Sequence, residues 1–214
     1  MNLLLVDDHR LMRDGVRALL EQEPDLHVVG EAADGRRAVE LAEKLRPDLV
    51  LMDITMPGLS GVEATRRLQS TLPRTRVLGL SMNADRRYVQ AMFEAGAWGY
   101  MLKSAASEEL IRAVRSVAAD QKYVSPAIAG VVVEALVGGP GTRDADPLAE
   151  LSAREREVLQ LIAEGHTSKQ IADMLGVAAS TIETHRKQVT AKLHVRSVAE
   201  LTKLAVRAGL TPLG

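Results

Sequence analysis

Residues 3–20 read LLLVDDHRLMRDGVRALL, and this stretch predicts how the N-terminal half of the chain folds. Four apolar residues in a row are typical of a buried strand, and the two acids that follow end it. Met12, Val16 and Leu19 then recur at the three- and four-residue spacing of an amphipathic helix. A strand followed directly by a helix is the repeating unit of an α/β domain.

The same unit repeats as far as residue 120. The predicted strands cover residues 3–6, 27–32, 49–52, 76–80 and 98–102, and an amphipathic stretch follows each of them. Strict alternation of strands and helices implies parallel strands, right-handed crossovers and helices on both faces of the sheet. We therefore expect a doubly wound α/β domain with a five-stranded parallel sheet.

The alternation ends at residue 121. Ser125 followed by Pro126 favours the start of a short apolar helix that runs to residue 137. The next ten residues, GGPGTRDADP (138–147), have the composition of a flexible linker. We interpret residues 121–147 as a connecting helix and linker between two domains.

Residues 148–214 contain no strand pattern and form a small all-α domain in our interpretation. The predicted helices cover residues 152–164, 168–175, 179–193 and 197–208. Ser152 and Glu155 have the spacing of a capping box, and Gly165 and Gly176 are placed to end helices. The predicted organisation is thus residues 1–120, 121–147 and 148–214.

Composition excludes several kinds of site. The chain of 214 residues has no Cys, which excludes disulfide frameworks, thiolate zinc sites and cysteine nucleophiles. No apolar run approaches the roughly 20 residues of a membrane helix, and no signal peptide is evident, so we expect a cytoplasmic protein. The net charge is −1, but residues 180–214 carry six basic and two acidic side chains, which permits DNA binding there.

Polar residues stand at the carboxyl ends of four predicted strands, where open α/β sheets bind ligands. Asp7 and Asp8 end the first strand, Asp53 the third, Ser81 the fourth and Lys103 the fifth. Each acid alone could be an ordinary helix N-cap, but three carboxylates at one edge need compensating cations. Lys103 supplies one charge, and oxygen ligands at an open site favour Mg²⁺. A carboxylate balanced in this way can attack phosphorus, which makes Asp53 a candidate nucleophile and Ser81 a donor to the phosphoryl oxygens.

The first domain resembles the receiver domain of bacterial two-component response regulators, a flavodoxin-like fold. The residues that carry the resemblance are LLLVDDH (3–9), MDITMPGLSG (52–61), LGLSMN (78–83) and GYMLKS (99–104). It implies that a histidine kinase phosphorylates Asp53. It also implies that Asp8, Asp53 and the Thr55 backbone carbonyl hold Mg²⁺ and that Asp7 assists through water. Ser81 and Tyr100 match the family's switch pair, whereas Ser104 departs from the Pro that commonly follows the lysine.

Residues 151–207 resemble the LuxR-type helix-turn-helix of the NarL/FixJ subgroup. The carriers are LSAREREVLQLIAEG (151–165), TSKQIADMLGV (167–177) and STIETHRKQVTAKLHV (180–195). A helical wheel of the third helix places Ile182, Val189 and Leu193 toward the core. Its opposite side would enter the major groove of double-stranded DNA. The predicted DNA-binding residues are Lys169, Ser180, Thr181, Glu183, Thr184, His185, Lys187, Gln188 and Lys192.

Within this set, Lys187 and Gln188 are the candidates for base contacts, because Lys pairs well with guanine and Gln with adenine. His185, Lys192 and Lys169 are placed for phosphate contacts, with a solvated surface charge as the alternative for Lys192. Glu183 departs from the family pattern, which commonly has Lys there. The last helix could support the core or pair two copies on DNA.

We therefore expect a transcription factor that a histidine kinase switches on by phosphorylating Asp53 with Mg²⁺ present, and that forms a homodimer when phosphorylated. It would not be a dedicated enzyme, although it could remove its own phosphate. One alternative is an aspartyl-phosphate phosphatase, but such enzymes usually carry a second acid two residues after the nucleophile, where this chain has Thr55. Another is a DNA-binding protein whose receiver is inert to phosphorylation.

Overall fold

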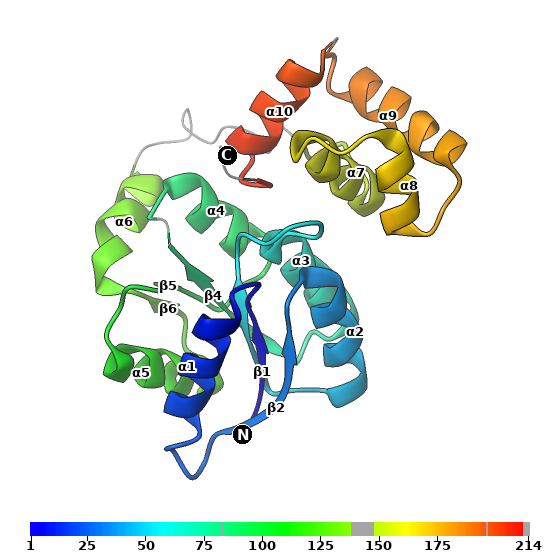
Figure 1. Cartoon of the computed structure of the whole chain (residues 1–214). Coiled ribbons are helices and arrows are strands. Elements are labelled where there is room, and N and C mark those ends of the chain that lie inside the picture. The colour runs from blue at the N-terminus through cyan, green and yellow to red at the C-terminus, as the bar shows by residue number, and fades with distance from the viewer. Residues whose placement is uncertain (83, 138–147, 196, 212–214) are drawn as a thin grey trace. The chain divides into compact units, whose positions relative to one another are not determined.

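The computed structural model describes residues 1–82, 84–137, 148–195 and 197–211. The chain divides into two compact units, Met1–Gly139 and Pro140–Gly214, and each is described by itself (Figure 1). The predicted linker at residues 138–147 lies outside the described residues.

The first unit is built on a parallel sheet in the order β2-β1-β3-β4-β5-β6. The strands are β1 (Asn2–Val6), β2 (His27–Ala32), β3 (Leu49–Asp53), β4 (Arg76–Ser81), β5 (Gly99–Leu102) and β6 (Tyr123–Val124). The expectation of five strands is wrong, because Tyr123 and Val124 pair with Gly99 and Tyr100 of β5. Two residues are too few for a periodic sequence pattern to reveal a strand.

Helices cover both faces of this sheet, which confirms the doubly wound fold (Figure 1). They are α1 (Arg10–Leu20), α2 (Gly35–Leu45), α3 (Gly61–Thr71), α4 (Arg86–Glu94) and α5 (Ser107–Ala118). Leu4 and Val6 of β1 pack with residues of α2, α3 and α4, whereas Leu3 and Leu5 pack with residues of α1 and α5. The alternation of side chains along a strand therefore supplies two separate cores.

The segment after β6 starts its helix later than predicted. Pro126–Ile128 form a short 3-10 turn (η1), and α6 follows over Ala129–Val137. Ser125 does not cap this helix; its hydroxyl instead lies 2.5 Å from Oε1 of Glu109. The predicted N-cap is wrong: the Ser125 hydroxyl donates to a carboxylate of α5 and accepts no hydrogen bond from an amide of the turn that follows.

The second unit is a small helical domain, as the sequence predicts. Its helices are α7 (Ala153–Ala163), α8 (Ser168–Leu175), α9 (Ala179–Lys192) and α10 (Val198–Arg207). Ser152 and Glu155 form the predicted capping box, and Gly176 ends α8 in the left-handed conformation at φ 64°. In the described ranges, no helix is long and apolar enough to span a bilayer.

Candidate functional site

Three charged side chains from three strands meet at the carboxyl edge of the first sheet. The Lys103 ammonium, which follows β5, lies 2.6 Å from Oδ2 of Asp7 and 2.8 Å from Oδ2 of Asp53. The strand register brings them together, because β1 pairs with β3, β3 with β4 and β4 with β5, all in parallel. Each of the three side chains is at most 5% exposed, so the ion pairs are shielded from water.

Burial and ion pairing shift the pKa values of Asp53 and Lys103 in opposite directions. Burial raises the pKa of Asp53 to about 6, while the hydrogen bond and charge of Lys103 lower it. For Lys103, burial lowers the pKa, but the hydrogen bonds to Asp53 and Asp7 outweigh it, so that the pKa is raised. Lys103 therefore stays charged at neutral pH and favours the ionised form of Asp53.

The acid cluster also offers ligands for a metal ion. Asp7, Asp8, His9 and Asp53 each provide one ligand atom, and these atoms lie within 4.8 Å of one another. The Asp8 side chain is 27% exposed, more open than those of Asp7 and Asp53. Mg²⁺ prefers oxygen ligands and keeps several waters, so carboxylates at a partly open edge fit it.

The loop after Asp53 is shaped by glycine. A Cβ on Gly61 would lie 1.9 Å from the Asp53 carbonyl oxygen, and the Gly61 amide donates to Ile54 O at 2.9 Å. Gly58 has φ 80°, a left-handed conformation that favours glycine. The loop thus folds back against the end of β3, and the Thr55 amide donates to Oδ1 of Asp53 at 3.3 Å.

Ser81 and Tyr100, the predicted switch pair, lie on neighbouring strands and are both buried. Burial raises the pKa of Tyr100 to about 12, while a side-chain hydrogen bond with Ser81 lowers it. The hydroxyls of Ser81 and Tyr100 are therefore hydrogen-bonded to each other. Ser81 lies on β4, the strand that pairs with β3 and hence with the strand that carries Asp53. The Lys103–Ser104 peptide is trans, like all peptide bonds of the described chain.

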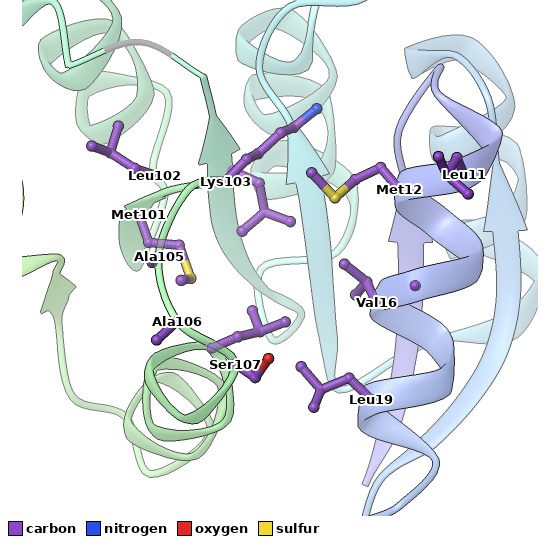
Figure 2. A pocket seen from close by; sticks show the side chains of 13 residues that line it. Leu11, Met12, Val16, Leu19, Met101, Leu102, Lys103, Ala105, Ala106 and Ser107 are labelled. Atoms are coloured by element: carbon purple, nitrogen blue, oxygen red, sulfur yellow. The ribbon is translucent and has the colours of Figure 1, made fainter.

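A pocket of about 220 Å³ lies between α1 and α5 and borders the site, because Lys103 lines one part of it. Figure 2 shows Met12, Val16 and Leu19 of α1 on one side, facing the segment from Met101 to Ser107 on the other. Leu11, at its edge, is 86% exposed. The pocket therefore joins an apolar surface to the acid cluster.

The polar side of α9 is open to solvent. Ile182 and Val189 are fully buried and Leu193 is partly buried, as the helical wheel predicts. The exposed predicted DNA-binding residues are Lys169, Ser180, Thr181, Glu183, Thr184, Lys187 and Gln188. His185 is half-buried, and its Nδ1 is buried without a hydrogen-bond partner in the described part of the chain.

Lys192 has a partner that the sequence did not reveal. Its ammonium lies 2.7 Å from Oε2 of Glu155, the residue that caps α7. Burial raises the pKa of Glu155, but hydrogen bonds from Lys192 and Ser152 outweigh this effect, so that the pKa is lowered. Lys192 thus joins the end of α9 to the start of α7.

Comparison with known proteins shows which families contain the acid cluster of the first unit and the exposed helix α9 of the second. Residues 3–115 match the family model of the response regulator receiver domain, and residues 149–205 match that of the luxR family of bacterial regulatory proteins. The chain is a LuxR-type response regulator. It is a DNA-binding regulator of a two-component system.

Relatives of this response regulator extend over its full length. It is 39% identical to the response regulator GacA of Pseudomonas aeruginosa over 98% of this chain and 97% of that protein. It is 36% identical to the response regulator UvrY of Escherichia coli K12 over 98% and 95% of the two chains. A structure of the response regulator RcsB in complex with DNA has a TM-score of 0.60 at 26% identity and covers 97% of this chain and 98% of its own.

A second solved structure has a higher sequence identity to part of the chain. It is a two-component response regulator of the LuxR family from Aurantimonas sp. SI85-9A1, with a TM-score of 0.61 and 40% identity. It covers 64% of this chain and 97% of its own.

Proposed function

We propose that a sensor histidine kinase activates this regulator by transferring a phosphoryl group to Asp53, and that phosphorylation promotes a homodimer on DNA. The observation that carries the proposal is the buried Asp53 carboxylate, held 2.8 Å from Lys103 at the edge where Asp7 and Asp8 converge. The family implies a kinase partner and an acidic Mg²⁺ pocket, and Asp53 is the acid at the end of the central strand.

In the reaction, a carboxylate oxygen of Asp53 attacks phosphorus while the bond from phosphorus to the donor histidine nitrogen breaks. Lys103 holds Asp53 ionised and in place and stabilises charge on the transferred oxygens. The Ser81 hydroxyl, now bonded to Tyr100, would turn to a phosphoryl oxygen. Asp8, Asp53 and the Thr55 carbonyl would hold Mg²⁺, with Asp7 assisting through water, and the bound ion would supply positive charge to the reaction.

The kinase must place its histidine beside Asp53, so its docking surface must adjoin the acid cluster. The pocket between α1 and α5 has this position, with exposed Leu11 at its rim and Lys103 in its wall. We propose that an apolar helix face of the kinase covers it. Water attacking the aspartyl phosphate would return the regulator to its resting state.

For DNA recognition, we propose that Lys187 and Gln188 read bases, because both lie on the exposed side of α9. Lys169, Ser180, Thr181, Thr184 and His185 would contact the DNA backbone. Glu183 would weaken binding beside a phosphate, unless it accepts a hydrogen bond from a cytosine amino group. Lys192, whose ammonium pairs with Glu155, would share its charge between that carboxylate and a phosphate. The division into residues 1–120, 121–147 and 148–214, and a cytoplasmic location, belong to the same proposal.

Labelling of the full chain with a small-molecule phosphodonor and Mg²⁺ tests the acceptor. Intact-mass spectrometry should detect one phosphoryl group on the wild type and none on Asp53→Asn. The matched control is Asp14→Asn, which removes an exposed acid of α1 and should label normally. Equal labelling of wild type and Asp53→Asn would remove Asp53 as the acceptor and favour an inert receiver.

A further inference from the structure

An imidazole stands among the carboxylates at the mouth of the acid cluster. Nδ1 of His9 lies 2.8 Å from Oδ1 of Asp8 and 3.5 Å from Oδ1 of Asp7. The His9 side chain is 74% exposed, and its backbone amide donates to Oδ1 of Asp7 at 2.9 Å. In the described part of the chain, the polar partners of the His9 ring are thus Asp7 and Asp8, both members of the acid cluster.

The spacing of these atoms suits ligands of one ion. Ligands about 2.1 Å from a metal, in neighbouring octahedral positions, lie about 3 Å apart. The Nδ1 of His9 and the Oδ1 of Asp8 have nearly this separation, and atoms of Asp7 and Asp53 lie within 4.8 Å. A single cation can therefore contact the ring and the carboxylates with small side-chain movements.

Imidazole nitrogen changes which ion such a site prefers. Mg²⁺ favours oxygen ligands and retains its waters, so it gains little from a histidine. Divalent ions of the later first-row transition metals bind imidazole well and follow the order Co²⁺, Ni²⁺, Cu²⁺ in rising affinity. A carboxylate site with one accessible imidazole is thus a mixed oxygen and nitrogen site.

We propose that His9 is a direct ligand that makes this site bind late first-row transition ions, such as Co²⁺ or Zn²⁺, more tightly than Mg²⁺. Asp8 and Asp53 supply the oxygen ligands. The inference rests on the metal site of the proposed function, but it concerns a residue and an ion class that phosphorylation with Mg²⁺ does not require. The chain would therefore bind two classes of cation at one place, in competition.

Calorimetric titration tests this assignment. The full chain, without a polyhistidine tag, is titrated with Co²⁺ and separately with Mg²⁺. In His9→Asn the Co²⁺ affinity should fall about tenfold or more. The Mg²⁺ affinity should change by less than about threefold, because Mg²⁺ does not use the ring. Asn is a favourable N-cap, so the substitution preserves the start of α1, whose N-cap is His9.

The matched control is His27→Asn, which removes an exposed histidine at the start of β2 and should keep both affinities. Asp8→Asn should weaken Co²⁺ and Mg²⁺ together. Unchanged Co²⁺ affinity in His9→Asn would overturn the proposal, and so would an equal loss for both ions. Failure of the proposed function would be seen in a different experiment: with Mg²⁺ and a phosphodonor, Asp53 of the wild type would not be labelled.

Discussion

The two functional regions of this regulator hold their charges in opposite ways. In the receiver, Asp7, Asp53 and Lys103 are buried and joined at 2.6 and 2.8 Å. On α9, Lys187 and Gln188 are exposed. A reacting carboxylate benefits from fixed, dry surroundings, because preorganised charges cost no rearrangement during the reaction. Side chains that read DNA stay in water until the nucleic acid replaces that water.

The largest effect should come from Lys103→Ala. It leaves the carboxylates of Asp7 and Asp53 buried without their cation, which should cost about 3 to 5 kcal/mol of receiver stability. Urea unfolding followed by the fluorescence of Trp98, the single tryptophan, reports this unit. Lys44→Ala, at an exposed site on α2, should cost less than about 0.5 kcal/mol. Equal effects would mean that burial of the triad carries no energetic weight.

Asp53→Asn should stabilise the receiver at neutral pH without divalent ions. The folded-state pKa of Asp53 is about 6, above the ordinary value of 3.8, so folding takes up a proton between these two pH values. The contribution of Asp53 to stability is complete below pH 3.8 and is lost as the pH rises through about 6. The variant should gain up to about 3 kcal/mol at pH 7 and nothing at pH 3.

Unfolding curves of wild type and variant at the two pH values measure this difference. Asp14→Asn, at a side chain 58% exposed, should show no comparable pH dependence. A larger gain in acid than at neutral pH would contradict the raised pKa.

On the DNA side, Lys187→Ala should cost about 1 to 3 kcal/mol of binding and relax preference at one base pair. Its folding stability should be unchanged because Lys187 is exposed. Selection of bound genomic fragments gives a target, and competition among single-base variants of it measures preference. An unchanged preference profile would remove Lys187 from the base-reading residues.

Lys192→Ala tests a charge that is more exposed than Lys103 and less exposed than Lys187. Its side chain is 39% exposed, and that of its partner Glu155 is 4% exposed. The second unit should lose at most about 1 kcal/mol, because the Lys192 ammonium is partly exposed and solvent screens its interaction with Glu155. The pKa of Glu155 should rise toward its ordinary value, which NMR titration detects. DNA affinity should fall to a similar degree for all sequences if Lys192 contacts phosphate, in contrast to Lys187→Ala.

The smallest change in stability is expected for Leu11→Glu, within about 0.5 kcal/mol, because Leu11 is already in water. Phosphotransfer from the kinase should slow, whereas labelling by a small-molecule phosphodonor should not. Arg10→Glu, at a side chain 86% exposed one residue earlier, controls for added charge on α1. Equal rates from the kinase for wild type and Leu11→Glu would place docking elsewhere.

Sequence patterns predicted the fold where they were long or ended in polar residues. The alternation of Leu3, Leu4, Leu5 and Val6 between two cores follows from strand geometry, and the position of Asp53 follows from the end of β3. The strand Tyr123–Val124 was missed because two residues show no period. The side-chain partners of Lys192 and His9 depend on how distant elements pack or how a loop turns, which no local pattern records.

The sixth strand has a mechanical consequence for the route out of the receiver. Val124 pairs with Tyr100, and the Ser125 amide donates to the Tyr100 carbonyl oxygen at 3.0 Å. The backbone of residues 124 and 125 is therefore hydrogen-bonded to Tyr100, whose hydroxyl forms a hydrogen bond with Ser81. A displacement of Tyr100 would therefore act directly on the backbone of β6, which comes just before η1 and α6 in the chain.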